Sequence, residues 1–169
     1  MSSTRQIAIE HVVIASNQPY KKVLEGLENR LGSVEGWRAI SRRVQAMVTV
    51  QLSWEQFEAE AARNLGPHDF LLFNTVEHTP LLTLAGKTSR AIQYLVGNPL
   101  LAMRMSRFLP EIALYAPLRL VVYENEADNT FVAYDNFVSL LAQYHHEEIT
   151  RVAQIVEQKL EALLAEVTQ

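Results

Sequence analysis

The sequence predicts an α+β fold: an antiparallel sheet of about five to six strands packed against helices on one side, with a long C-terminal helix. Three observations lead to this prediction. Residues 7–14 alternate as a strand with a buried face does, and a series of short strand-like runs separated by turn-like links follows residue 70. The end of the chain carries an apolar stripe at helical spacing. The stripe consists of Ile149, Val152, Val156, Leu160 and Leu163.

The composition is that of an ordinary globular protein and disfavours several functional classes. The chain has 169 residues, of which 49% are hydrophobic and 20% charged, so we expect a single domain over residues 1–169. A net charge of -4 disfavours general nucleic-acid binding, because phosphate recognition depends on clustered cations. The absence of cysteine excludes disulfides and thiolate nucleophiles. With no apolar run near the ~20 residues of a membrane helix and no secretion signal, we expect a cytoplasmic protein that does not engage a membrane.

The first half of the chain is predicted to begin with a strand and a helix. After the strand at residues 7–14, Ser16 or Asn17 can cap a helix that has Pro19 in its first turn, where the missing N–H costs nothing. Gly32 then supplies the stop for this helix.

Residues 33–51 are ambiguous. A helix would place Trp37 on an apolar stripe with arginines on another side, whereas Gly36 disfavours a helix. The arginines are Arg38, Arg42 and Arg43, which we expect to form a solvated face. The next helix is clearer, because Ser53 and Gln56 form a capping-box pattern before a helical apolar stripe.

The second half of the chain alternates short apolar runs with turns. Runs at residues 70–76, 81–85 and 91–96 are separated by His-Thr-Pro and Gly-Lys-Thr-Ser, which predicts an antiparallel meander of three strands. Runs at residues 118–124 and 130–134 are joined by Asn-Glu-Ala-Asp-Asn, which predicts a hairpin.

Between the meander and the hairpin lies the stretch YLVGNPLLAMRM, residues 94–105. Gly97 can adopt backbone angles closed to other residues, Asn98 is a good helix N-cap, and Pro99 fits the first helical position. The stretch therefore predicts a sharp strand-to-helix corner and a substantially buried helix after it. We expect the methionines on either side of Arg104 to fill apolar space.

Three stretches, YLVGNPLLAMRM, LYAPLRLVVYENE and FVAYDNFVSLL, resemble in their order and spacing the domain-of-unknown-function 302 family of mostly bacterial proteins. The family has a Pro-Leu before a strand ending in Tyr-Glu, and later a Tyr-Asp. The matching residues here are Pro117, Leu118, Tyr123, Glu124, Tyr134 and Asp135. The chain departs from the family where Asn136 and Phe137 stand in place of a proline. The resemblance implies a compact α+β domain that commonly self-associates and has no assigned reaction.

A set of polar and aromatic residues is the best candidate site. Polar groups that converge near a sheet edge and a helix N-terminus could hold a small anionic ligand, because free backbone N–H groups favour negative charge there. The same residues also have plain structural roles, as a cap, as buried aromatic bulk or as the start of a turn. The candidates are His78, Tyr94, Asn98, Arg104, Tyr115, Arg119, Tyr123, Tyr134 and Asp135.

The sequence predicts neither a metal site nor a cofactor. His145 and Glu148 are the one pair in the His-His-Glu-Glu run with the spacing of ligands on a single helical face, and we expect an exposed, acid-rich helix start there instead. The phosphate-loop, dinucleotide-binding, nucleophile-elbow and zinc-protease motifs are all missing.

Three functions follow from these observations. The first, which we prefer, is a module that binds a small molecule, an anionic one included, in a pocket reached by Tyr94, Arg104 or Arg119, and that forms homodimers. The second is an enzyme in which His78 acts as acid or base beside a carboxylate such as Glu77 or Asp135. The third is a purely structural dimerisation protein, with the terminal helix stripe or the Leu-Tyr-Ala-Pro-Leu loop buried in a twofold partner.

Overall fold

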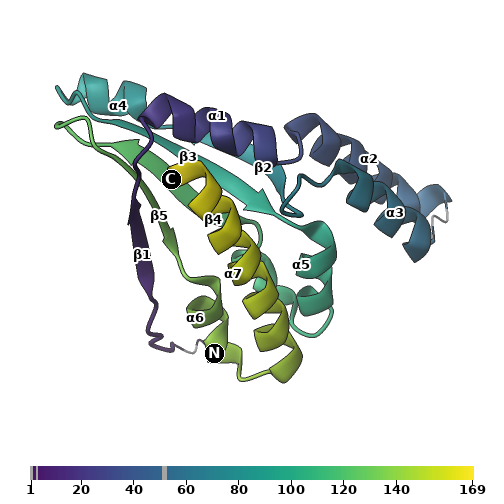
Figure 1. Cartoon of the computed structure of the whole chain (residues 1–169). Helices are drawn as coiled ribbons and strands as arrows, with labels where there is room; N and C mark the ends of the chain where they lie inside the picture. The colour runs from purple at the N-terminus through teal and green to yellow at the C-terminus, as the bar shows by residue number, and fades with distance from the viewer. Residues whose placement is uncertain (1, 3, 51–52) are drawn as a thin grey trace.

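The strands of the chain form one antiparallel sheet in the order β1-β5-β4-β3-β2 (Figure 1). The computed structural model describes residue 2 and residues 4–50 and 53–169. The strands are β1 (His11–Ala15), β2 (Leu71–Glu77), β3 (Arg90–Gly97), β4 (Leu118–Glu124) and β5 (Thr130–Asp135). The predicted α+β class with an antiparallel sheet is confirmed, and β4, from the predicted hairpin, is the central strand.

The described chain also contains α-helices and short 3-10 helices. The α-helices are α1 (Tyr20–Arg30), α2 (Val34–Val50), α3 (Trp54–Asn64), α4 (Thr79–Leu84), α5 (Pro99–Ser106), α6 (Phe137–Leu141) and α7 (Glu147–Thr168), and the short 3-10 helices are η1 (Pro110–Leu114) and η2 (Ala142–Tyr144). The ambiguous segment is therefore helical from residue 34 to residue 50, and its residue 51 lies outside the described residues. The predicted capping box at Ser53 is present, with Gln56 as its partner.

The main core lies between one face of the sheet and the helices α1 and α7, which lie across the same side of the sheet (Figure 1). Alternation puts every second strand residue on this face, including Tyr94, Leu120 and Tyr134, all of which are buried. The apolar stripe of α7 is buried in the same core. The stripe is thus not available to a twofold partner, and the expectation that it forms a dimer surface is wrong.

Helices α2 and α3 lie side by side and project from the β2 edge of the sheet as an arm (Figure 1). A second, smaller cluster of apolar residues, Ile40, Phe57, Ala61 and Leu71, joins the arm to the sheet. The two ends of the arm meet at Gly32 and Gly66, whose backbone N–H groups both donate to the Phe70 carbonyl. A Cβ at Gly32 would lie 1.9 Å from the carbonyl oxygen of Asn64, so only glycine fits this crossing. This close backbone contact at Gly32 and Gly66 attaches the arm to the sheet.

One predicted strand is wrong: residues 81–85 belong to the helix α4 and its end, so the sheet has five strands. Pro80 has no N–H to donate to a strand ladder and fits the first turn of a helix. The N–H of Thr79 is bound by Glu77 Oε1 at 3.1 Å, and the Thr83 hydroxyl donates to the Thr79 carbonyl at 3.0 Å, as in one turn of helix. Short apolar runs are compatible with both strands and helices, and here the hydrogen bonds of local polar groups favour the helix.

Three local predictions also change. The first strand begins at His11, so the part of residues 7–14 before it lies outside the sheet. The cap position of α1 is held by Pro19, which has no polar side chain to cap the helix, and the Ser16 hydroxyl bonds instead to Gln18 and to the Thr168 carbonyl. Gly97 has no positive φ; a Cβ there would lie 3.3 Å from Phe73, which makes close approach the reason for glycine.

No described helix is both long enough and apolar enough to cross a membrane.

Candidate functional site

A pocket of about 380 Å³ lies at the corner where β3 ends and α5 begins. It is the place where the sequence predicts a sharp turn, and the turn is present: Gly97 ends β3, Asn98 caps α5, and Pro99 is its first residue. The pocket collects side chains from the arm, the edge strand, the loop before β4 and the helices α5, α6 and α7. The lining residues are Trp37, Phe73, Gly97, Asn98, Pro99, Leu101, Ala102, Met103, Met105, Ser106, Ala116, Pro117, Leu118, Phe137 and Val156.

The lining is almost entirely apolar. Trp37, Asn98 and Ser106 are the lining residues with polar side-chain atoms, and none of the lining residues is charged. The Ser106 hydroxyl donates to the Ala102 carbonyl at 2.8 Å, as serine does inside a helix. The rings of Trp37 and Phe73 meet at 4.3 Å between centroids and form the wall on the arm side. Such a lining favours an apolar ligand.

Asn98 is at the pocket, and both polar atoms of its side chain have partners in the protein. Its Oδ1 accepts from the N–H groups of Leu100 at 2.9 Å and Leu101 at 3.1 Å, and its Nδ2 donates to the Asp69 carbonyl at 2.9 Å. The N–H of Ala102 donates to the Asn98 carbonyl. Since Pro99 has no N–H, the first turn of α5 has no amide left for an anion.

Tyr94 and Tyr134 point into the main core, away from solvent and from the pocket lining. Tyr94 is fully buried, and its hydroxyl has no hydrogen-bond partner among the described residues. The Tyr134 hydroxyl donates to Glu157 Oε1 at 3.0 Å, and the N–H of Phe137 donates to Glu157 Oε2 at 2.7 Å. Burial raises the pKa of both tyrosines and of the Glu157 carboxyl. These groups hold the fold together and are closed to a ligand.

Three further candidates lie on the opposite face of the sheet. Tyr123 stacks on Phe131 of the next strand, with centroids 5.1 Å apart and planes 19° apart. The Asp135 carboxylate bonds to His11 Nδ1 at 2.8 Å. Arg119 is exposed on β4. Tyr134 and Asp135, which are neighbours in the sequence, thus face opposite sides of the sheet.

Tyr115 and Arg104 are held elsewhere. The Tyr115 hydroxyl accepts from Gln143 Nε2 at 3.0 Å in a shallow groove beside Tyr144. Arg104 Nη2 pairs with Glu148 Oε1 at 3.1 Å on the outer side of α5. Hydrogen bonds from Arg151 and then from Arg104 hold the pKa of Glu148 below its usual value.

His78 lies at the end of the sheet opposite the pocket. It precedes α4 and follows Glu77, whereas the pocket lies at the Leu71 end of β2, about 20 Å away along the strand. Asp135 also lies at the pocket end, because it pairs with His11 and follows Tyr134, the partner of Leu120. A catalytic pair of His78 with Asp135 is therefore excluded by the register.

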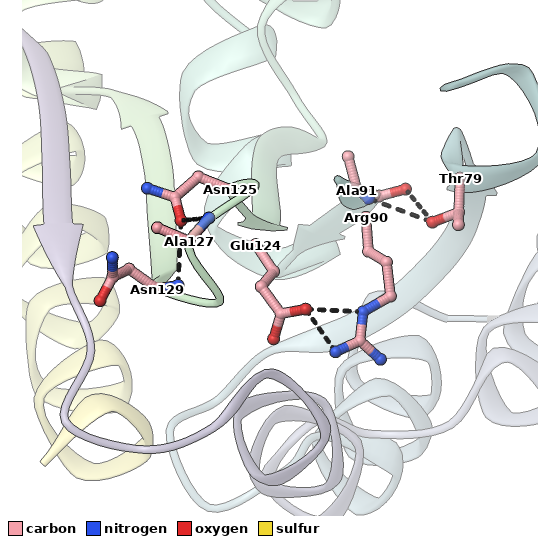
Figure 2. A network of polar contacts seen from close by, with 7 residues as sticks. All are labelled: Thr79, Arg90, Ala91, Glu124, Asn125, Ala127 and Asn129. Carbon is pink, nitrogen blue, oxygen red and sulfur yellow. Dashed lines mark hydrogen bonds and ion pairs between the residues drawn. The ribbon is translucent and has the colours of Figure 1, made fainter. Parts of the chain in front are cut away.

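The polar groups around the His78 end of the sheet bind one another, as Figure 2 shows. Arg90 Nε donates to Glu124 Oε1 at 2.9 Å, and the N–H of Ala91 donates to Thr79 Oγ1 at 3.1 Å. In the adjoining turn, the Asn125 side-chain oxygen accepts two backbone N–H groups. The Arg90 guanidinium also lies 4.7 Å above the ring of Tyr20. This network fastens strand ends and α1.

The predicted cluster is therefore dispersed, and among its members only Asn98 lines the pocket. The residues that sequence reasoning missed are apolar: Trp37 from the ambiguous segment, Phe73 from the edge strand, and Phe137 and Val156 from the last helices. The stretch around Gly97 gave the one usable signal, a helix start rich in leucine and methionine. In the part of the chain that the structure describes, no three His, Asp or Glu residues group as metal ligands.

Comparison with known proteins adds a family and a fold. The family model described as "Domain of unknown function DUF302" matches residues 46–167. A crystal structure described as that of the uncharacterized conserved protein DUF302 from Bacillus stearothermophilus is similar, with a TM-score of 0.63 and 16% sequence identity over 93% of this chain and 97% of that chain. At this identity, the similarity shows the fold alone. No curated protein matches the chain.

Proposed function

The chain belongs to the DUF302 family, for which the matching description gives no function, and from the geometry of its own pocket we propose that it binds a small, uncharged, apolar molecule. The observation that carries the proposal is the pocket at the start of α5, which combines a useful size with an apolar lining drawn from distant parts of the chain. Ligand sites are typically concave, largely preformed and about 300–1,000 Å³ in volume. The pocket lies within this range.

The chemistry of the lining indicates the class of ligand. An anion would lose its hydration shell and gain no cation, since Arg104 pairs with Glu148 and the first amides of α5 are bound by Asn98. An apolar molecule gains about 25 cal/mol for each Å² of apolar surface that it removes from water. Because a water molecule occupies about 30 Å³ of the liquid, the pocket volume suits a ligand of at least about a dozen non-hydrogen atoms.

Trp37 allows the proposal to be tested directly, because it lines the pocket and the chain has one other tryptophan, Trp54, on the exposed side of α3. In a Trp54→Phe background, titration with the neutral fluorophore N-phenyl-1-naphthylamine should quench Trp37 emission saturably, with one site per chain. 1-Decanol should displace the fluorophore better than decanoate does, because decanoate carries a charge.

A matched pair of variants separates the pocket from general surface binding. Ala102→Phe, which fills the pocket from α5, should weaken fluorophore binding by about tenfold or more, a loss of about 1.4 kcal/mol. Ala59→Phe makes the same change on the exposed face of α3 and should leave binding unchanged. Equal binding by the two variants, or quenching that never saturates, would overturn the proposal. Stronger competition by decanoate than by 1-decanol would also overturn it, in favour of an anionic ligand.

A further inference from the structure

The shallow groove beside Tyr144 is a second concave site, of about 880 Å³. Its lining comes from three separate segments of the chain: residues 4–7 before β1, residues 110–115 of and just after η1, and residues 143–144 of η2. We call it the η1 groove. It shares no lining residue with the apolar pocket, and it mixes charged, polar and apolar side chains. Such a lining suits a ligand that carries both charges and apolar atoms.

Two side chains of opposite charge, Arg5 and Glu111, line the η1 groove. Neither forms an ion pair within the part of the chain that the structure describes. The guanidinium carbon of Arg5 lies 5.6 Å from the centroid of the Tyr144 ring. Burial, and after it the neighbouring Glu111 carboxylate, raises the pKa of the Tyr144 hydroxyl to about 12. The two unpaired charges therefore border one aromatic ring.

Arg5 is held in place and keeps hydrogen-bond donors for a ligand. Its Nη2 donates to Gln143 Oε1 at 2.7 Å, and its Nη1 donates to the Gln143 carbonyl at 3.4 Å. Gln143 is oriented in turn, because its Nε2 donates to the Tyr115 hydroxyl at 3.0 Å and to the Leu140 carbonyl at 2.8 Å. These bonds use two of the five N–H groups of the guanidinium, so three stay available. Arginine typically binds a carboxylate through two parallel bonds, for which these donors suffice.

Apolar side chains complete the η1 groove. Leu114 is 72% exposed, although it is a large hydrophobic residue. Tyr115 meets Tyr144 edge to face, with 6.4 Å between the ring centroids, and the half-buried Ile7 also lines the groove. An apolar ligand group that covers this surface removes it from water, which is favourable. The groove thus offers apolar surface next to one positive and one negative charge.

We propose that the η1 groove binds a free α-amino acid with an apolar side chain. The carboxylate of this ligand accepts from Arg5, its ammonium group donates to Glu111, and its side chain packs against Leu114. A ligand with both charges gives both residues a partner, whereas a simple anion or cation leaves one of them without any. Binding at the η1 groove does not depend on the apolar pocket, and it can persist when fluorophore binding fails.

Isothermal titration calorimetry with three ligands tests the two charges separately. L-Phenylalanine should bind saturably, with one site per chain. 3-Phenylpropionate has the same ring and carboxylate but no ammonium group, and 2-phenylethylamine has the ammonium group but no carboxylate. Each of these two analogues should bind about fivefold or more weakly than L-phenylalanine, because each lacks one of the two charge-assisted hydrogen bonds.

Two variants connect each charged group of the ligand with its residue. Glu111→Gln should bind L-phenylalanine about fivefold more weakly than the wild type does, and it should no longer prefer L-phenylalanine to 3-phenylpropionate. Arg5→Gln should lose about as much affinity, and it should no longer prefer L-phenylalanine to 2-phenylethylamine. Glu58→Gln and Arg63→Gln make the same changes on the exposed side of α3 and should leave binding unchanged.

Circular dichroism and the melting temperature should show that both groove variants fold, since Arg5 and Glu111 are exposed. Both should also bind the fluorophore of the apolar pocket as the wild type does, because neither residue lines that pocket. A wild-type chain without saturable L-phenylalanine binding would overturn the proposal. So would an analogue that binds as tightly as L-phenylalanine, groove variants that keep the wild-type preferences, or an equal loss of affinity with the α3 controls.

Discussion

Tyr94 and Tyr134 provide a matched pair of hydroxyl deletions for which we expect opposite signs. Both lie on the core face of the sheet, and both are at most 5% exposed. They differ in one respect: the Tyr134 hydroxyl donates to Glu157 at 3.0 Å, whereas the Tyr94 hydroxyl has no partner among the described residues. Replacing each tyrosine with phenylalanine removes the same atom, so the difference between the variants measures the hydrogen bond.

The expected magnitudes follow from the two environments. Burial of a hydroxyl without a partner costs about 1–3 kcal/mol, so Tyr94→Phe should raise the free energy of unfolding by about 1 kcal/mol or more. A hydrogen bond to a charged group contributes about 1.5–3 kcal/mol, so Tyr134→Phe should lower it by about that amount. In a chain of this length, 1 kcal/mol shifts the melting temperature by about 2–4 °C.

Urea unfolding followed by circular dichroism gives the free energy, and the m-value shows whether the unfolding reaction is otherwise unchanged. Leu120→Asp serves as a positive control for the same layer, because Leu120 is 1% exposed on the central strand and a charge there should unfold the protein. If Tyr94→Phe destabilised the protein as much as Tyr134→Phe does, the reasoning would be refuted, because the Tyr94 hydroxyl would then have a bond to lose.

Two further predictions concern single polar groups. Asn98→Ala should lower the free energy of unfolding by about 0.5–2 kcal/mol, because the cap of α5 is lost. Asn98→Asp keeps the acceptor oxygen and should lower this free energy by less. Equal losses of the two variants in urea unfolding would mean that the cap is not the cause. Burial raises the pKa of Glu157, so the folded state holds the carboxyl proton more tightly than the unfolded state does. The contribution of this carboxyl to stability is therefore present below its unfolded pKa of about 4.3. It is lost as the pH rises through the raised pKa of the folded state. The melting temperature of Glu157→Gln should therefore increase relative to that of the wild type as the pH rises from about 4 upward. A difference in melting temperature that does not change with pH would contradict the raised pKa.

The elements that local chemistry determines could be predicted from the sequence. The corner at Gly97, Asn98 and Pro99 and the cap at Ser53 depend on residues within one turn, and both are present. The sequence predicts a strand at α4 because the leucines of this segment show no decisive helical or strand period. Leu84 is 85% exposed, so the apolar residues of the segment do not mark its buried face. A six-residue segment has too few positions for its hydrophobic pattern to identify it.

The candidate site could be predicted only in part, because contacts across the sheet depend on register. Alternation alone separates Tyr134 from Asp135, which face opposite sides. The sequence gives no comparable way to place Tyr94 and Tyr123 on different faces, since that requires the alignment of β3 with β4. The pocket was harder still, because Trp37 and Val156 meet there from opposite ends of the chain.

The lining of the pocket supports the proposed binding function, because it contains no titratable side chain. A general acid or base needs a titratable group that faces a cleft and is within hydrogen-bond reach of a substrate. Several polar groups elsewhere in the described chain bind other groups of the protein. The Tyr134 hydroxyl donates to Glu157 in the core, the Glu148 carboxylate accepts from two arginines, and the Asn98 side chain caps α5. The pocket, by contrast, offers a ligand an apolar surface. Since burial of apolar surface is the dominant favourable term in association, the pocket is where the proposed apolar ligand would gain the most free energy.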